Sequence, residues 1–122
     1  MGANVNLLHQ GYAPNGSIAV DALVGYLHIT KTELAAAAGL PREAVSKKAR
    51  LNSQKTQRRL GEVVEIVNRV LPWIGTVQAA FAWYRAQPLP SFGRLTAEDL
   101  VKAGRGESVR NYLPRVAAGG YT

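Results

Sequence analysis

The longest regular pattern in the chain is a helical spacing of apolar residues over residues 53–71. Apolar side chains recur there at intervals of three and four, which places them on one face of a helix. On the other face, Glu65 and Arg69 are four positions apart and opposite in sign, as in a stabilising helical pair. Ser53 is a suitable N-cap, and Pro72 predicts that the helix ends before it. The apolar positions, which we expect to form the centre of the core, are Leu60, Val63, Val64, Val67, Val70 and Leu71.

The start of the chain has no such pattern. Residues 1–16 include many small and polar residues, three of them glycines, so we predict an arm without a helix of its own. From Ser17 onward the apolar residues take helical spacing. This predicts a short helix over residues 17–27 with Ser17 as its N-cap.

Two further short helices are predicted before the long one. Thr30 and Glu33 have the spacing of a capping box and open an Ala-rich helix over residues 31–38. Gly39 then supplies the left-handed residue that ends this helix. The next helix starts at a proline, which is tolerated at a first helical position, and covers residues 41–50.

Two short helices that meet at a glycine, with small side chains inside, are typical of the helix-turn-helix motif. An ordinary hairpin of an all-α protein has the same pattern, so both interpretations remain open. The polar and basic outer face favours DNA binding, because such side chains contact phosphates and base edges. The candidate DNA-binding residues are Thr32, Arg42, Glu43, Ser46, Lys47, Arg50, Arg58 and Arg59.

After the long helix the pattern predicts another over residues 76–85, which carries Trp83. A large aromatic residue on a helix face is typical of a core anchor. Residues 87–93 contain two prolines and a glycine, and we predict a loop without regular structure there.

The last part of the chain predicts two more helices. Thr96 caps a short one that ends at Gly104. The final helix covers residues 107–118, and Pro114 is expected to kink it or split it in two. The chain then closes with two glycines, a tyrosine and a threonine. Composition alone favours disorder for such a tail.

The charge of the chain is unevenly distributed. The 122 residues carry a net charge of +7, and residues 41–60 hold seven of the fifteen Lys and Arg, whereas residues 1–30 hold none. A concentration of one sign favours a polyanionic partner, although a solvated face is the alternative. A chain of this length forms one domain or two small ones with a shared core, and oligomerisation would add buried surface.

Composition also excludes several classes of site. Without cysteine there are no disulfides, thiol nucleophiles or Cys-type zinc sites. His9 and His28 lie far apart with no acid at ligand spacing, so we expect no metal and no cofactor. No combination of residues typical of catalysis is present, and we expect that the protein is not an enzyme. No charged-then-apolar leader opens the chain and no apolar run approaches the ~20 residues of a membrane span, so we predict a cytoplasmic protein without membrane contact.

Four segments near the end of the chain follow one another in a specific order. They are an aromatic run at 81–84 (FAWY), a proline loop ending in glycine at 88–93 (PLPSFG), a short helix at 96–101 (TAEDLV), and a helix ending in two glycines and an aromatic at 112–121 (YLPRVAAGGY). In order and spacing these segments resemble the toxin-binding domain of the Xre/MbcA/ParS family of antitoxins, which neutralise RES-domain toxins. Residues 30–69 resemble the Xre-like helix-turn-helix half of the family, less specifically.

The resemblance and the helical pattern together predict an all-α protein in three parts. These are an arm of residues 1–16, an Xre-like helix-turn-helix domain of residues 17–71 and a C-terminal toxin-binding domain of residues 72–122. The resemblance implies that the last part holds a RES toxin, an enzyme that cleaves NAD or transfers ADP-ribose. The toxin-binding candidates are Trp83, Arg115, Gly119, Gly120, Tyr121 and Thr122.

The resemblance also implies that the extreme C-terminus enters the NAD pocket of the toxin. The two glycines give the tail conformational freedom, Tyr121 can stack as a flat ring, and the carboxylate of Thr122 can pair with a cation that otherwise holds phosphate. The resulting hypothesis is an antitoxin that blocks its toxin, represses its own operon through operator DNA, and forms a homodimer or a hetero-oligomer with the toxin. The alternative is a helix-turn-helix repressor without a toxin partner.

Overall fold

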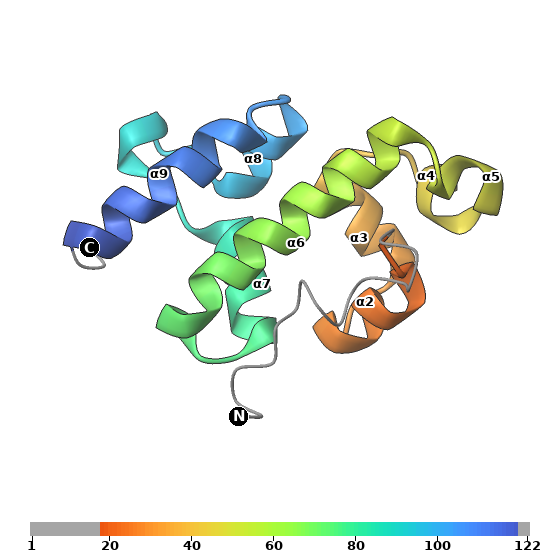
Figure 1. Cartoon of the computed structure of the whole chain (residues 1–122), viewed down its shortest axis with the longest axis horizontal. Helices are drawn as coiled ribbons and strands as arrows, with labels where there is room; N and C mark the ends of the chain where they lie inside the picture. Colours follow the sequence, from red (N-terminus) through yellow and green to blue (C-terminus); the bar gives the residue numbers. More distant parts are fainter. Residues whose placement is uncertain (1–17, 120–122) are drawn as a thin grey trace.

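The computed structural model describes residues 18–119, and it describes only the backbone at Lys48, Ala49 and residues 116–119. Over the described range the chain is helical and contains no β-strand, which confirms the all-α prediction (Figure 1). The predicted arm and Ser17 lie outside that range. The first described helix, α2 (Val20–Leu27), has Ala19 at its N-cap position, so the predicted N-cap at Ser17 is wrong by two residues.

Helix α6 (Gln54–Ile74) crosses the whole molecule, and helices from both halves of the chain pack along it (Figure 1). Ser53 caps it as predicted, because its hydroxyl accepts a hydrogen bond from the Thr56 N–H at 3.2 Å. The predicted end is wrong, since α6 continues through Pro72 for two more residues. The proline lies on the exposed side of the helix, where a local bend does not disturb the core.

The buried face of α6 is the centre of a single core. All six predicted apolar positions of this helix are buried, and Ile66 is buried with them. They join buried residues from α2, α3 (Lys31–Ala38), α7 (Val77–Ala86), α8 (Ala97–Lys102) and α9 (Gly106–Gly119) in one cluster. The boundary predicted between residues 71 and 72 therefore lies inside a helix and marks no gap in the core.

Helix α3 begins and ends as the sequence predicts. Thr30 and Glu33 form the capping box, with both backbone-to-side-chain hydrogen bonds at 3.0 Å. Gly39 follows the helix at φ 68°, in the left-handed region. Local chemistry within a few residues is sufficient to define both ends.

The C-terminal end of α3 is also held by residues far away in the sequence. The last four carbonyls of a helix have no partner within it, and here all four accept hydrogen bonds. Two accept from backbone N–H groups of the following turn. The other two accept from side chains: the Tyr84 hydroxyl donates to Ala37 at 2.6 Å, and the Arg59 guanidinium donates to Ala38 at 3.1 Å. The end of α3 is therefore attached to both α6 and α7.

The predicted helix over residues 41–50 is broken into two single turns, α4 (Glu43–Ser46) and α5 (Lys48–Leu51). Between them Lys47 is extended, with φ −109° and ψ 123°. Val45 is buried and Leu51 packs against the core. In one continuous helix, a side chain six positions later is rotated by about 240° around the helix axis, so Val45 and Leu51 would not face the same way. The break allows both side chains to face inward.

The segment predicted as an irregular loop is more ordered than expected. It contains a short 3₁₀ helix, η2 (Pro90–Phe92), and Leu89 pairs with Leu95 in an isolated antiparallel bridge. Thr96 and Asp99 then form a capping box at the start of α8. Of the two outcomes predicted for Pro114, a kink or a split, the split is wrong, because α9 is continuous through this exposed residue.

A buried carboxylate joins α7 to α8. The Glu98 side chain is 8% exposed. Its carboxylate oxygens form ion pairs with the Arg85 Nε at 2.6 Å and with the Lys102 Nζ at 2.7 Å. Burial raises the pKa of Glu98, but the hydrogen bonds from Arg85 and Lys102 outweigh burial and hold this pKa below its ordinary value of 4.5. The folded protein therefore favours the charged form of Glu98 more than the unfolded chain does.

This lowered pKa predicts acid sensitivity. A carboxyl with a lower pKa in the folded state stabilises the fold above its unfolded pKa, and that stability disappears as pH falls through the folded pKa. We expect Glu98→Gln to lower the free energy of unfolding by about 1–3 kcal/mol at pH 7 and to reduce its decline below about pH 5. Urea denaturation at several pH values measures this. Glu43→Gln, at an exposed position, is the control, and an unchanged pH dependence in Glu98→Gln would contradict the prediction.

Candidate binding surfaces

Most of the predicted DNA-binding residues gather at one end of the molecule. The single turns α4 and α5 lie there beside the start of α6, opposite the end at which α9 finishes (Figure 1). Thr32 is exposed in the first turn of α3. The exposed candidates on or beside α4, α5 and the first turns of α6 are Arg42, Glu43, Ser46, Lys47, Arg50 and Arg58. We call the exposed basic members of this set, Arg42, Lys47, Arg50 and Arg58, the basic surface.

This surface lacks the long outer helix that the helix-turn-helix interpretation requires. A recognition helix enters the major groove along several of its residues, whereas α4 and α5 are four residues each. The Ser46 hydroxyl also donates to the Arg42 carbonyl at 3.1 Å within its own turn. The arrangement leaves cations exposed, without an extended row of side chains aimed at base edges.

Arg59 has a different position from its neighbour Arg58. Its side chain is half-buried, and its guanidinium donates to the carbonyls of Ala38 and Gly39 at 3.1 and 3.4 Å. A cation at a helix C-terminus is stabilised both by these carbonyls and by the helix dipole. Both arginines are candidate DNA-binding residues by sequence, but the contacts of Arg59 hold the end of α3.

The two arginines therefore predict different stability effects. We expect Arg59→Ala to lower the free energy of unfolding by about 1–2 kcal/mol, because the carbonyls at the end of α3 lose a charged donor. We expect Arg58→Ala to change it by less than about 0.5 kcal/mol, because Arg58 is exposed. Urea denaturation of the two single variants compares them directly. Equal effects would mean that the Arg59 contacts do not stabilise the fold.

The predicted toxin-binding residues fall into three groups. Trp83 is buried in the core on α7, at 8% exposure, which agrees with its interpretation as an anchor and leaves little surface for a partner. Arg115 is exposed on α9, and Gly119 is the last residue of that helix. Gly120, Tyr121 and Thr122 lie outside the described residues.

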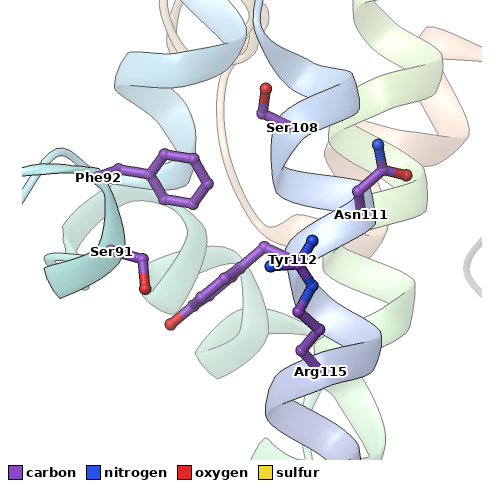
Figure 2. A pocket seen from close by; sticks show the side chains of 6 residues that line it. All are labelled: Ser91, Phe92, Ser108, Asn111, Tyr112 and Arg115. Carbon is purple, nitrogen blue, oxygen red and sulfur yellow. The ribbon is translucent and has the colours of Figure 1, made fainter.

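A pocket of about 540 Å³ lies between η2 and α9. Ser91 and Phe92 come from η2, and the Tyr112 side chain extends from α9 toward them (Figure 2). The rings of Phe92 and Tyr112 meet edge to face with centroids 5.3 Å apart, and the Arg105 guanidinium lies 5.7 Å from the centre of the Phe92 ring. The lining residues are Ser91, Phe92, Ser108, Asn111, Tyr112 and Arg115, and we call this site the η2–α9 pocket.

Only Arg115 of this pocket was a candidate from the sequence. Residues 108, 111, 112 and 115 have the spacing of one helix face, which is a visible signal. The position of η2 against that face was not predictable, because the segment had been expected to be irregular. The pocket has an aromatic wall and several hydrogen-bonding groups, and no Asp or Glu lines it.

A second hollow, of about 610 Å³, lies between α6 and the start of α9. Its charges are mixed and partly paired, since Arg110 donates to Glu65 at 2.9 Å and Glu65 also lies 3.8 Å from Arg69, as predicted. The Glu62 carboxylate lies against Gly106, at the start of α9, where a helix favours negative charge. These contacts support α9 against α6.

Within residues 18–119 no three His, Cys, Asp or Glu side chains are grouped as a metal site would require. Among the helices in that range, none has both the length and the apolar composition to cross a bilayer. Comparison of the chain with protein-family models, curated proteins and solved structures finds no match.

Proposed function

We propose that this protein is an antitoxin that binds a RES-domain toxin and blocks access to its NAD pocket. The activity requires no catalytic group of its own, because an inhibitor needs only to occupy the path of the substrate. The protein acts in the cytoplasm, as a homodimer or in a hetero-oligomer with the toxin. Its C-terminal residues are the ones that enter the toxin.

The observation that carries this proposal is the packing of the four segments that resemble the antitoxin family. They fall on α7, η2, α8 and α9, and α8 packs against both α7 and α9. Phe92 and Tyr112, from the second and fourth segments, are in ring contact at 5.3 Å. Segments that would share one binding function are therefore adjacent in space as well as in order.

The chemistry of the last residues also supports the proposal. α9 finishes at Gly119, at the opposite end of the molecule from α4 and α5 (Figure 1). The chain continues from there with Gly120, Tyr121 and Thr122. An aromatic ring after two glycines is suited to a narrow cleft that otherwise receives a flat ring.

Co-purification tests the proposal at the level of binding. Genes next to the one for this chain are searched for a RES-domain protein, which is then co-expressed with the tagged full-length chain. We expect the two proteins to elute as one stable complex in size-exclusion chromatography. Separate elution of two folded proteins would contradict the proposal and would favour a repressor without a toxin partner.

The basic surface favours a second function, binding of operator DNA. Its four cations lie exposed at one end of the molecule, and a polyanion gains affinity from each phosphate that such cations neutralise. The short turns α4 and α5 predict that phosphate contacts dominate this affinity. Repression of the operon by such a protein would depend on a preference for the upstream DNA that remains when salt weakens the electrostatic contribution.

Salt titration tests this second function. We expect Arg50→Ala to weaken binding to upstream operon DNA and to random DNA by similar factors, and to reduce the slope of log K against log salt by about one. Fluorescence anisotropy with both duplexes at several salt concentrations measures the slopes. Lys31→Ala is the control, because Lys31 is not a member of the basic surface and its ammonium group lies 3.2 Å from the Asp21 carboxylate. A slope in Arg50→Ala equal to that of the unchanged chain would contradict phosphate contact at this position.

A further inference from the structure

The η2–α9 pocket contains hydrogen-bonding groups that the described part of the chain leaves unpaired. The side chains of Ser91, Ser108 and Asn111 make no hydrogen bond to any described residue. Arg115 likewise forms no ion pair within residues 18–119. The pocket therefore offers a cation and several donors at one place.

The arrangement of these groups selects the kind of ligand. Asn111 follows Ser108 by three positions, and Arg115 follows Asn111 by four and Ser108 by seven. This spacing places the three residues along one face of α9. The Arg115 side chain runs back along the helix toward Tyr112 (Figure 2). A guanidinium presents a planar fork of donors that matches the two oxygens of a carboxylate.

Arg115 lines the pocket beside two aromatic rings, and the Arg105 guanidinium lies over one of them, 5.7 Å from the Phe92 centroid. Two guanidinium groups beside apolar rings are better suited to one carboxylate than to a nucleic-acid backbone. Backbone phosphates are bound by several cations in a row, and here Arg115 is the one cation among the lining residues. The rings of Phe92 and Tyr112 offer apolar contact to the methylene groups of an acidic side chain. Arg115 also lies four residues before Gly119, so a protein that holds the tail would cover this pocket as well.

We propose that the η2–α9 pocket receives an Asp or Glu side chain of a partner protein, with Arg115 pairing with the carboxylate. This inference rests on the proposed function in naming the RES toxin as that partner. The pairing would fix the orientation of the partner on α9. The pocket and the tail are thus two separate contacts with one protein.

A titration that needs no toxin tests the pocket itself. The full chain, labelled with ¹⁵N, is titrated with acetyl-Ala-Glu-Ala-amide, with acetyl-Ala-Gln-Ala-amide and with inorganic phosphate. We expect the Glu peptide to shift the amide signals of Phe92, Ser108 and Asn111, and to bind about tenfold more tightly than the Gln peptide. Arg115→Ala should remove that difference, whereas Arg69→Ala, an exposed arginine elsewhere, should preserve it. Equal binding of the two peptides, or tighter binding of phosphate, would overturn the proposal.

The toxin complex provides the second readout. We expect Arg115→Glu to raise the Kd for the RES toxin by about a hundredfold and Arg69→Ala to leave it within about twofold. An acid-to-Lys substitution on the toxin should restore affinity to Arg115→Glu. An unchanged Kd in Arg115→Glu, beside tight binding of the unchanged chain, would overturn the pocket contact and leave the antitoxin function intact. If the unchanged chain does not bind the toxin, the antitoxin function fails and the peptide titration alone decides the pocket.

Discussion

Deletion of residues 119–122 is expected to abolish inhibition of the RES toxin while the protein stays folded. The deleted residues follow Leu113, the last position of α9 that is buried among the side chains that the structure describes, so we expect the described core to be unchanged. The tail supplies the groups proposed to occupy the NAD pocket. A few anchors usually carry most of the energy of an interface, and we expect the concentration for half-inhibition to rise about a hundredfold or more.

NAD consumption by the purified toxin measures this effect directly. A chain in which residues 119–122 are replaced by four serines keeps the length of the tail and is the matched control, and it should fail to inhibit as the deletion does. Thermal unfolding of both variants should match that of the unchanged chain. Full inhibition by the deletion variant would contradict insertion of the tail, even if the complex still forms.

The second large effect is expected at Gly39. This residue has φ 68°, a conformation that costs a residue with a Cβ atom about 1–2 kcal/mol. An added Cβ would also lie 2.8 Å from the Arg59 Nη1 and 3.0 Å from the Lys102 Cα. The side chain of Arg59 can move only by giving up its bonds to α3, and the α8 backbone must shift. We expect Gly39→Ala to lower the free energy of unfolding by about 2–5 kcal/mol in total.

Gly93 provides a matched control for that experiment. It has φ 65°, but an added Cβ there meets no atom within 4 Å. Gly93→Ala should therefore show the backbone strain alone, at about 1–2 kcal/mol. Urea denaturation of both variants gives the difference, which measures the close approach of α3, α6 and α8. Equal losses in the two variants would mean that this junction adjusts without cost.

The starts of several helices could be predicted from the sequence because their chemistry is local. Thr30 with Glu33, Ser53 alone, and Thr96 with Asp99 each satisfy N–H groups within three residues. The apolar face of α6 was equally clear from its spacing. These features depend on neighbours along the chain, and tertiary packing did not alter them.

Tertiary packing did decide where the elements continue or break. Pro72 was expected to end its helix and Pro114 to kink or split its own, yet both lie on exposed faces of continuous helices. Lys47 has no sequence signal for a break, but the inward packing of Val45 and Leu51 requires one. Propensity is a weak guide wherever burial on either side of a residue favours another conformation.

The candidate sites were predictable only in part for the same reason. Charge counts located the basic surface, but they did not separate Arg58 from Arg59, whose partners lie about twenty residues away in α3. The η2–α9 pocket joins residues 91 and 92 to residues 108–115 across the intervening helix α8. No local pattern encodes that contact, because it depends on how α8 places α9 against η2.

Titration of the toxin with the full-length chain tests the central claim most directly. NAD consumption by a fixed amount of the neighbouring RES-domain protein is followed as the chain is added in increasing molar ratio. The proposed function predicts that consumption falls linearly and stops at a fixed stoichiometric ratio. Consumption that continues unchanged in the presence of excess folded chain would contradict it.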